Sequence, residues 1–526
     1  MGVRRIPDLI SATALATFVV AGAFFFPFTV DDAFIPARYG ANLVEHGALV
    51  YNIGDRISAL TSPLHGLVYA AIYAAAGDAL ITVWKILSAL LVVAGVVAIS
   101  RTTRDAWERA TIAVFLLGSS AVVLWTWGGL ETPILFALVA ASVALIARPL
   151  SANRLAVLFV LSGVAFVARY DSVLFTVPVC AHAAWRVGRW SSFLRAAAIG
   201  AVVPVAWLGI AQTFYGDIWP TSYYVKAPRF PARNIQRNAV YMAEWLVLTG
   251  TVPLAALYLL NARSRKRGMG WLNWPWAGVA AGMVLLLAYG LGVATHHMMF
   301  SFRHFVPYFP VLALVAAAGV SALERRFGPA AATTVLAAFL AGQCMHIGYT
   351  YTRSVNGAVV GVGEYRNQGA GSYADGFLRA MLEAGRDVRV HWAGTGKTRS
   401  PRIDTFAAGA LPWVVREAYV FEPLVSFRLN SVIRLGPGWT IVAPIPERRQ
   451  GPLTTVRSID LRGASDYVHV LSPRHGSIER HLAKPVNEYE LVSRHTIRFD
   501  GSTQEMLVFY DRNPTPITLP RTVRGE

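Results

Sequence analysis

Two adjacent carboxylates, Asp31 and Asp32, open a polar stretch that directly follows the first hydrophobic segment of the chain. At the end of a membrane span these side chains can stay ionised at the water interface, without the several kcal/mol that deep burial of a charge costs. A carboxylate there can accept a proton from a hydroxyl group or coordinate a divalent ion such as Mg²⁺ or Mn²⁺. It can equally do no more than solvate the end of the span.

Further charged residues stand at the ends of later hydrophobic segments. Glu131 precedes Pro133 after the third predicted span, and Arg169 and Asp171 follow the fifth. Each has a structural alternative, because a carboxylate is favoured at the N-terminal end of a helix and an arginine near an aspartate can form a local ion pair. Both interpretations, a site role and a structural role, stay open for these residues.

Cations on the same side of the membrane would suit a phosphate. Lys226 follows an aromatic stretch that includes Tyr224, and Arg303 and His304 lie just before the tenth predicted span. Guanidinium and ammonium groups stabilise phosphoryl oxygens through charge-assisted hydrogen bonds, whereas aromatic rings also serve as interfacial anchors. Carboxylates and cations at one membrane level predict transfer of a group from a lipid-linked phosphate. A carboxylate would handle the acceptor hydroxyl or a bound metal, and the cations would stabilise the departing phosphate.

Composition sets the class of protein. Of the 526 residues, 55% are hydrophobic and only 15% are charged, which is typical of a polytopic membrane protein. The net charge of +18 is scattered in short clusters between apolar runs, so it indicates membrane topology and not nucleic-acid binding. Cys180 and Cys344 both lie in apolar segments, which argues against a disulfide framework and a cysteine metal site.

Membrane spans are the elements that position these residues. A span needs about 20 largely apolar residues, and flanking Lys and Arg mark the cytoplasmic side. Arg4 and Arg5 place the N-terminus inside, and the bulky residues after the first span predict a retained signal anchor. The apolar run 64–76 is too short to cross, and we predict a half-embedded helix on the outer surface there, because five later cationic loops then all face the cytoplasm.

The remaining apolar runs complete the predicted topology. About eleven spans result, at 9–28, 81–99, 110–127, 133–147, 155–168, 172–185, 196–215, 239–260, 272–294, 305–321 and 329–348. An odd number of spans places the rest of the chain outside. The sequence thus predicts an α-helical polytopic membrane domain over 1–349 and a soluble periplasmic α/β domain over 350–526.

Within the predicted periplasmic domain, the hydrophobic runs shorten to the length of strands. We predict one helix, over Tyr373–Ala384. We also predict strands over VRVHW (388–392), WTIVAP (439–444), YELVSRHTIRF (489–499) and EMLVFYD (505–511). Charged residues alternate with these runs, and the portion of about 175 residues is long enough for its own core.

Six short strings occur in an order and spacing that resembles the membrane glycosyltransferases of the GT-C superfamily. They are DDAFI (31–35), RYGANL (38–43), TSPL (61–64), GLETP (129–133), YYVK (223–226) and RHFVPYFP (303–310). Within the superfamily they are similar to the bacterial arabinofuranosyltransferase branch, which includes the terminal arabinofuranosyltransferase of the mycobacterial cell wall and the pilin arabinosyltransferases. The similarity covers the membrane part of the chain.

The resemblance implies a GT-C fold with embedded juxtamembrane helices and a polyprenyl-phosphate sugar donor. It also implies a catalytic aspartate in the first outer loop and a periplasmic C-terminal domain that helps to hold the acceptor. Carried over by position, Asp31 or Asp32 would be the catalytic carboxylate, and Glu131 would be a second acid at the site.

The donor phosphate would be bound by the cations that match the family strings, namely Lys226, Arg303 and His304. Two departures from the family pattern limit the comparison. Arg169–Asp171 stands where relatives often carry an Arg-Pro-Asp turn, and the stretch 391–413 lacks the glycine-rich turn of the mycobacterial soluble domain, so the acceptor is not carried over. Further possible site residues are Arg38, His65, Arg169, Asp171 and Tyr224.

We therefore predict a glycosyltransferase of the bacterial inner membrane that moves a pentose, by resemblance arabinofuranose, from polyprenyl phosphate to an extracytoplasmic glycan or pilin-type acceptor. The alternative is a transporter or flippase of a lipid-linked sugar, which should show repeats or broken helices with buried charges at mid-membrane. A third possibility, an assembly or anchoring protein, would not need the Asp31 loop or Arg303. The metal requirement and the choice between Asp31 and Asp32 stay open.

Overall fold

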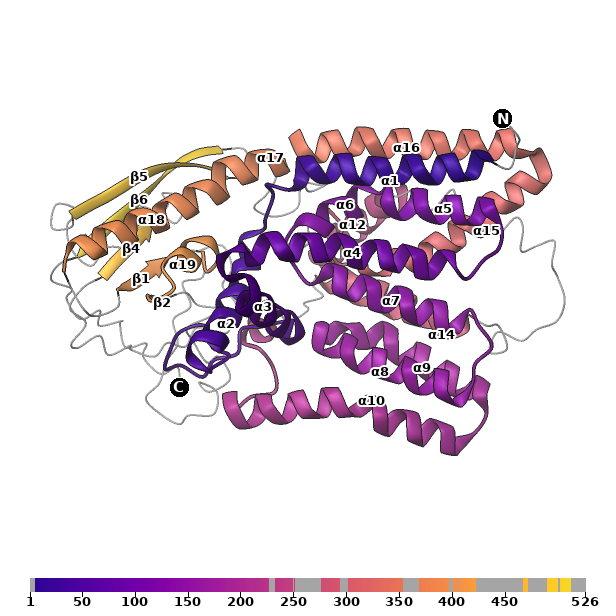
Figure 1. The fold of residues 1–526 in the computed structure, drawn as a ribbon, viewed down its shortest axis with the longest axis horizontal. Coiled ribbons are helices and arrows are strands. Elements are labelled where there is room, and N and C mark those ends of the chain that lie inside the picture. The colour runs from indigo at the N-terminus through magenta and orange to yellow at the C-terminus, as the bar shows by residue number, and fades with distance from the viewer. Residues whose placement is uncertain are drawn as a thin grey trace.

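The computed structural model describes residues 5–226, 232–248, 250, 276–293, 301–352, 369–396, 401–405, 407–421, 467–471, 490–499 and 502–511. Long apolar helices run roughly side by side, and a small sheet with its own helices lies at one end of them (Figure 1). The chain leaves α1 toward that sheet, whereas its N-terminus lies at the opposite end of the bundle. The loop after α1 and the C-terminal part therefore meet at the same end, where the Asp31 carboxylate accepts a hydrogen bond from Ala410.

Within the described residues, a helix covers each of the eleven predicted spans, the eighth being described only as far as Leu248. Most of these helices begin and end within a few residues of the predicted limits. Their bounds are α1 (Ile6–Phe25), α4 (Leu80–Ser100), α5 (Ala106–Leu117), α6 (Ser120–Trp127), α7 (Thr132–Ile146), α8 (Ala152–Ala168), α9 (Val173–Val187), α10 (Trp190–Ile210), α12 (Ala232–Leu248), α14 (Ala277–Val293), α15 (Phe309–Phe327) and α16 (Pro329–Thr352).

Fewer than eleven of the described helices are long and apolar enough to count as complete membrane spans. In the described ranges, five helical stretches are long and apolar enough to cross a membrane, and the pair α5–α6, bent by 55°, would be a sixth. Helices α7, α8 and most of α14 are apolar but shorter, as expected for helices that cross at a tilt or stay inside the bundle. The total of eleven spans stays a prediction.

The helix predicted over 64–76 is present as α3 (Pro63–Ala76). It ends at Gly77, whose φ of 55° requires the freedom of glycine, and the 3₁₀ turn η3 (Gly77–Ala79) separates it from α4. It packs against α2 (Phe34–His46), and a Cβ on Gly40 would lie 2.7 Å from the backbone nitrogen of Ala70. Figure 1 shows both helices between the bundle and the sheet; their depth in a membrane stays a prediction.

Short irregular helices connect the long helices. They are the 3₁₀ turns η2 (Asp31–Ala33), η4 (Tyr170–Ser172) and η7 (Val306–Tyr308), the π-helical turn η5 (Ala211–Tyr215), and the short helix α11 (Thr221–Lys226). Three of them, η2, η4 and α11, contain candidate site residues. The candidates therefore lie where regular spans end and not inside them.

The C-terminal part combines a mixed sheet with helices. Its sheet has the order β2-β1-β4-β6-β5, in which β1 pairs in parallel with β2 and β4, and β6 pairs antiparallel with β4 and β5. Its elements are α17 (Ala370–Tyr373), the π-helical turn η9 (Ala374–Leu378), α18 (Arg379–Gly394), β1 (Arg402–Thr405), α19 (Ala410–Val414), β2 (Tyr419–Phe421), β4 (Tyr467–Leu471), β5 (Glu490–Phe499) and β6 (Ser502–Asp511). The predicted strands over 489–499 and 505–511 are confirmed as β5 and β6.

The predicted strand over 388–392 is wrong, because these residues belong to α18. Met381, Ala384, Val388 and Trp392 are buried at intervals of three or four residues, so a helical stripe continues through the segment. The five residues VRVHW alternate in polarity, which is typical of a strand, but five residues are too few to show the longer helical period. The helix predicted over Tyr373–Ala384 is confirmed and longer, and the predicted strand over 439–444 lies outside the described residues.

Candidate functional site

The Asp31 loop is fixed where the chain leaves α1. The Nζ of Lys85 in α4 donates hydrogen bonds to the carbonyl oxygens of Phe26 and Phe28, the latter at 2.9 Å. The last carbonyls of a helix have no partner within the helix, so a lysine at this end satisfies them and matches the helix dipole. Lys85 therefore sets the point from which the loop carrying Asp31 starts.

A second contact joins this loop to the turn that carries Glu131. The N–H of Val30 donates to the carbonyl oxygen of Gly128 at 3.1 Å. Gly129 has φ of 84°, and a Cβ there would lie 2.9 Å from the Cβ of Ala33, so only glycine fits. The hydroxyl of Tyr69 in α3 donates to the Gly129 carbonyl at 2.6 Å. The two predicted acidic segments are thus in direct contact.

The structure distinguishes Asp31 from Asp32. Asp31 is 5% exposed, and its Oδ1 accepts a hydrogen bond from the N–H of Ala410 at 2.8 Å. Its own N–H donates to the Tyr373 hydroxyl at 3.0 Å. Asp32 is only partly buried, and its carboxylate has no hydrogen-bond partner among the residues that the structure describes. Asp31 faces the C-terminal part, and Asp32 keeps access to solvent.

Burial changes the acidity of Asp31. Removal from water raises the pKa of this carboxyl to about 7, and the charge of Asp32 adds to the effect, while the hydrogen bond from Ala410 opposes it. A carboxylate with a pKa near the working pH is suited to accept a proton and to release it again. The buried Asp31 carboxyl is therefore suited to acid–base chemistry near neutral pH, and its catalytic role stays a prediction.

Four charged side chains form a buried cluster beside the loop. Nη1 of Arg169 lies 2.8 Å from Oε1 of Glu131, and its Nε and Nη2 hold the two carboxylate oxygens of Asp171 at 2.9 and 2.7 Å. Nη2 of Arg303 lies 3.0 Å from the same Oε1 of Glu131. The predicted local pair of Arg169 and Asp171 is present, and it is also part of a network that the sequence had not indicated.

The two carboxylates of this cluster balance its two guanidinium groups. Burial alone would raise the pKa of Glu131, but Arg303 and Arg169 hold it well below the usual range. Burial would also raise the pKa of Asp171, but Arg169 keeps it below its ordinary value. Both carboxylates therefore stay ionised at neutral pH, and neither is suited to act as a general acid. Glu131 is thus held as an ionised carboxylate between two guanidinium groups, and its role in a reaction stays a prediction.

His304 lies at the edge of the same cluster. Its Nδ1 is 3.9 Å from Oδ2 of Asp171, and burial lowers its pKa to about 4 in spite of that carboxylate, so the ring is neutral at pH 7. Its buried Nε2 has no hydrogen-bond partner within the described ranges. A neutral imidazole can donate one N–H to a ligand, so His304 retains a free polar position at the site.

The backbone just before Arg303 and His304 is strained and is held by Trp125. The two preceding residues, Ser301 and Phe302, have φ of 47° and 58°, a region that costs side chains of this size about 1–3 kcal/mol each. Nε1 of Trp125 donates to the Ser301 carbonyl at 3.1 Å, and the Arg303 guanidinium lies over the Trp125 ring at 5.4 Å. Such strain concentrates at functional sites.

His65 is fully buried in α3 between two aromatic rings. Its ring centroid lies 4.1 Å from that of Tyr69 and 4.8 Å from that of Trp84. Neither ring nitrogen has a hydrogen-bond partner in the described part of the chain. Buried polar atoms usually find partners, so the residue adds a second unsatisfied imidazole near Glu131.

Lys226 and Tyr224 belong to α11, but their side chains lie outside what the structure describes. The helix is connected to the turn of the charged cluster through two ring contacts, one edge-to-face and one stacked. Trp219 contacts Tyr170 at 5.7 Å between centroids, and Tyr223 stacks on Trp219 at 5.0 Å. Tyr170 stands between Arg169 and Asp171 in the sequence, so α11 lies close to this turn. The roles of Lys226 and Tyr224 stay predictions.

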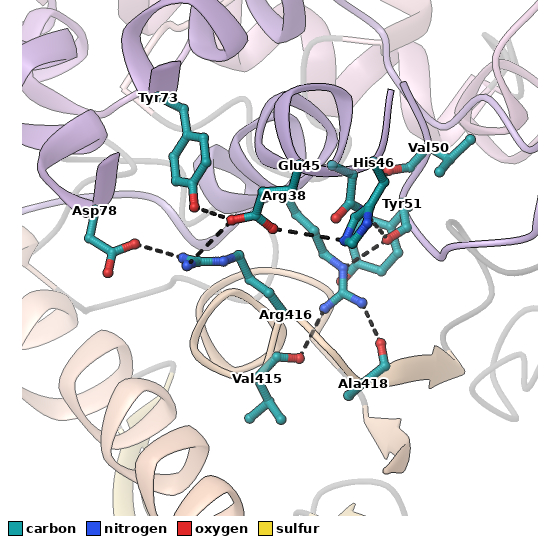
Figure 2. A network of polar contacts seen from close by, with 11 residues as sticks. Arg38, Glu45, His46, Val50, Tyr51, Tyr73, Asp78, Val415, Arg416 and Ala418 are labelled. Carbon is teal, nitrogen blue, oxygen red and sulfur yellow. Dashed lines mark hydrogen bonds and ion pairs between the residues drawn. The ribbon is translucent and has the colours of Figure 1, made fainter. Parts of the chain in front are cut away.

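Arg38 does not join the charged cluster. It is 1% exposed and donates to backbone carbonyls of the C-terminal part, from Nη1 to Pro412 at 2.7 Å and to Val415 at 3.4 Å, and from Nη2 to Ala418. Its Nε donates to the Tyr51 carbonyl at 2.8 Å. Figure 2 shows this guanidinium between Tyr51 on one side and Val415 and Ala418 on the other. Arg38 therefore connects two parts of the protein.

The described side chains do not form a metal site by themselves. Across the residues whose placement is described, no three side chains of His, Cys, Asp or Glu converge. Oδ1 of Asp31 is also engaged by the Ala410 N–H. The predicted divalent ion stays a prediction, and no chemical step is derived through it.

Sequence reasoning missed the residues that hold the Asp31 loop. Lys85 could have been noticed as a single lysine inside an apolar helix, because such residues are rare and have a specific partner. The contacts of Tyr373 and Ala410 with Asp31 span 342 and 379 residues of sequence and left no local signal.

No protein-family model matches the sequence, and no curated protein matches it. Two of the solved structures that share its fold are crystal structures of ArnT from Cupriavidus metallidurans. The one bound to undecaprenyl phosphate has a TM-score of 0.59 at 12% identity and covers 95% of this chain and 97% of that chain. The apo structure has a TM-score of 0.58 at 12% identity, with coverages of 96% and 97%. The predicted GT-C fold is confirmed, and the chain is a multi-pass membrane protein.

Proposed function

We propose that this protein is a membrane glycosyltransferase that moves a sugar from a polyprenyl-phosphate donor to an extracytoplasmic acceptor. The observation that carries the proposal is the Asp31 carboxylate, with a pKa of about 7, on a loop that contacts the buried cluster of Glu131, Arg169, Asp171 and Arg303. The fold adds support, because a structure of ArnT with the same fold was solved with undecaprenyl phosphate bound. An acid–base group beside cations suits this reaction.

Asp31 acts as the general base in the proposed reaction. The acceptor hydroxyl gives its proton to the carboxylate while the acceptor oxygen forms a bond to the anomeric carbon of the donor sugar. The bond between that carbon and the phosphate oxygen breaks, and polyprenyl phosphate leaves with the electron pair. Asp32, adjacent but partly exposed, is the second carboxylate of the same loop.

Arg303, His304 and Lys226 hold the phosphate in this proposal. The negative charge on the leaving oxygen grows as the bond breaks, and a fixed guanidinium stabilises it without reorganisation. Glu131 keeps the Arg303 side chain in place through its 3.0 Å contact. The neutral His304 contributes a hydrogen bond from Nε2, the atom without a partner in the described structure.

The sugar we propose is a pentose, arabinofuranose, and the acceptor is a glycan or a pilin-type protein. These finer assignments rest on the sequence resemblance to the arabinofuranosyltransferase branch. The placement we propose is the bacterial inner membrane, with the N-terminus cytoplasmic and the C-terminal domain periplasmic, as the distribution of Lys and Arg favours.

One observation favours the rival function, transport of a lipid-linked sugar. Helices α5 and α6 form a broken pair bent by 55°, and broken helices are typical of transporter sites. The break is filled by a neutral side chain, however, since Oε1 of Gln343 accepts from the Ser120 N–H at 3.0 Å and its Nε2 donates to the Leu248 carbonyl at 2.8 Å. The buried charged cluster of Glu131, Arg169, Asp171 and Arg303 lies beside the Asp31 loop and not at this break, which favours the enzyme.

The test uses the purified protein in lipid nanodiscs with a panel of radiolabelled polyprenyl-phosphate sugars. Label that leaves the lipid for water or for an added acceptor is scored for the wild type, Asp31→Asn and Asp32→Asn. We expect release from the arabinose donor, reduced about a hundredfold or more by Asp31→Asn, since a positioned base typically contributes that much. Asp32→Asn is expected to retain more activity. Binding without release of any sugar would favour the transporter, and full activity of Asp31→Asn would refute the base assignment.

A further inference from the structure

The C-terminal part contributes backbone directly to the site. We define the clamp segment as residues 408–418, which include α19 and the turn after it. We propose that the clamp segment positions the Asp31 carboxylate, and that Arg38 is the positioning residue that holds the clamp segment in place. The inference rests on the proposed role of Asp31 and extends it to a part of the chain that the sequence resemblance does not cover.

Gly409 makes the approach to Asp31 possible. A Cβ on Gly409 would lie 2.1 Å from the carbonyl oxygen of Asp31 and 2.3 Å from its Cγ and Oδ2, closer than any real contact. The main chain can therefore pass over the carboxylate only at a glycine. The next residue, Ala410, then directs its N–H to Oδ1 at 2.8 Å. The carboxylate is fixed by backbone, which cannot change rotamer as a side chain would.

Arg38 fixes the clamp segment from the other side. Its guanidinium donates to three carbonyl oxygens of that segment, those of Pro412, Val415 and Ala418. The Tyr51 hydroxyl adds a bond to the Ala408 carbonyl, and the Tyr51 ring lies 4.7 Å under the Arg38 guanidinium. A fork of several fixed donors is particular to arginine, and a lysine cannot reach three carbonyls with one nitrogen. Arg38 and Asp31 therefore hold opposite ends of one short segment.

Arg416 offers a matched comparison, because it also connects the clamp segment with the region around α2 and α3, but nearer the surface. It belongs to the clamp segment but points back, to Asp78 at 2.7 Å and to Glu45 at 3.9 Å, as Figure 2 shows. Its side chain and that of Asp78 are 23% and 77% exposed, so water screens this pair. Arg38 is buried in the interface and Arg416 is not, although both are arginines that cross it.

The first experiment measures hydrogen exchange of the peptide that covers the clamp segment, in nanodiscs, for the wild type, Arg38→Gln, Arg38→Lys and Arg416→Gln. We expect exchange at least about tenfold faster in both Arg38 variants, and a smaller change in Arg416→Gln. Unchanged exchange in the Arg38 variants would overturn the clamp. This experiment needs no substrate, so it tests the role of Arg38 in holding the clamp segment even if the wild type transfers no sugar. Absence of transfer by the wild type would refute only the proposed function.

The second experiment records the pH profile of sugar transfer for the same variants. Burial under the clamp segment is the largest cause of the raised pKa of Asp31 and outweighs the hydrogen bond from Ala410, so loosening the segment admits water and should move the midpoint of the acid limb downward by about one pH unit. The titratable groups around the loop are Asp32 on the same turn, Tyr373 on α17, Tyr69 on α3 and Lys85 on α4, and none of them is altered. A residue that merely supports the fold would lower the yield of protein and leave the midpoint unchanged.

Turnover should fall about tenfold to a hundredfold in Arg38→Lys, because small misplacements of a catalytic group have effects of this size. The KM for the donor lipid should stay within about threefold, because donor-phosphate groups are untouched. Faster exchange with normal turnover and a normal pH midpoint would overturn the inference.

Gly409→Ala keeps the test decisive if the Arg38 variants do not fold. The new methyl group must displace the clamp segment from Asp31 and admit water there, and we expect the same downward shift of the midpoint. Gly394→Ala in α18 is the matched control, since a Cβ there meets nothing within 4 Å. A Gly409→Ala protein with a wild-type profile would contradict the proposal.

Discussion

Asn52, between α2 and α3, exchanges two hydrogen bonds with the backbone of Val420 in β2. Its Nδ2 donates to the Val420 carbonyl at 2.9 Å, and its Oδ1 accepts from the Val420 N–H at 3.0 Å. Because β2 is the edge strand of the sheet among the strands that the structure describes, the amide side chain pairs with backbone groups that β1 does not reach. The membrane part and the sheet are thus joined by strand-like pairing.

Asn52→Asp should loosen this connection. The carboxylate keeps an acceptor for the Val420 N–H but replaces the donor with an oxygen that faces the Val420 carbonyl, which costs about 1–3 kcal/mol. We expect a lower melting temperature and faster hydrogen exchange in β2. Asn52→Asp with wild-type exchange at Val420 would show that the pairing contributes nothing.

Lys85→Met should destabilise the start of the Asp31 loop. Methionine fills similar space but leaves the carbonyls of Phe26 and Phe28 without their donor, at a cost of about 1–3 kcal/mol each. Thermal unfolding in nanodiscs measures the loss. Lys85→Arg is the control, because it keeps a cation and donors at the end of α1, and it should recover most of the stability. Equal melting temperatures for Lys85→Met and the wild type would contradict the prediction.

Glu131→Gln should be strongly destabilising, because it leaves the Arg169 and Arg303 guanidiniums buried without one of their counter-charges. Breaking a buried ion pair on one side typically costs about 3–5 kcal/mol. The matched control is Asp375→Asn in the exposed pair with Arg379, whose side chains are 66% and 64% exposed, and there the change should stay below about 1 kcal/mol. If thermal unfolding shows that Glu131→Gln and Asp375→Asn lower the free energy of unfolding by the same amount, this would argue against a buried network around Glu131.

The pKa of Asp31 predicts two opposite pH dependences. The folded protein holds the proton up to about pH 7, whereas an ordinary aspartate releases it near 3.8. The stability that this group contributes is therefore complete below about pH 4 and is lost as the pH rises through 7. Activity should rise over the same range, with a midpoint near 7, because the base must be ionised.

Asp31→Asn separates these two effects. The amide can still accept the Ala410 hydrogen bond but has no charge to bury. We expect this variant to be more stable than the wild type at pH 8, equally stable at pH 4, and nearly inactive at both. If Asp31→Asn changes the melting temperature by the same amount at pH 4 and at pH 8, the pKa of Asp31 is not raised in the folded protein.

The sequence by itself determined which segments are apolar and where charges interrupt them. A span must be about 20 residues long and free of unpaired charge, so α1, α10, α15 and α16 were predicted from composition alone. The pair Arg169 and Asp171 was also visible, because its partners are two residues apart. Local reasoning failed at 388–392, where a short alternating window concealed the longer helical period of α18.

Tertiary structure alone decided which carboxylate is held and what holds it. Asp31 and Asp32 are adjacent and chemically identical, and only the approach of Gly409 and Ala410 makes them different. That approach joins positions 379 residues apart through a backbone N–H, a group that every residue except proline carries. No pattern of side chains marks such a contact, because its position depends on how the whole chain packs. The role of Arg38 was hidden for the same reason, since its partners are carbonyl oxygens of a distant segment.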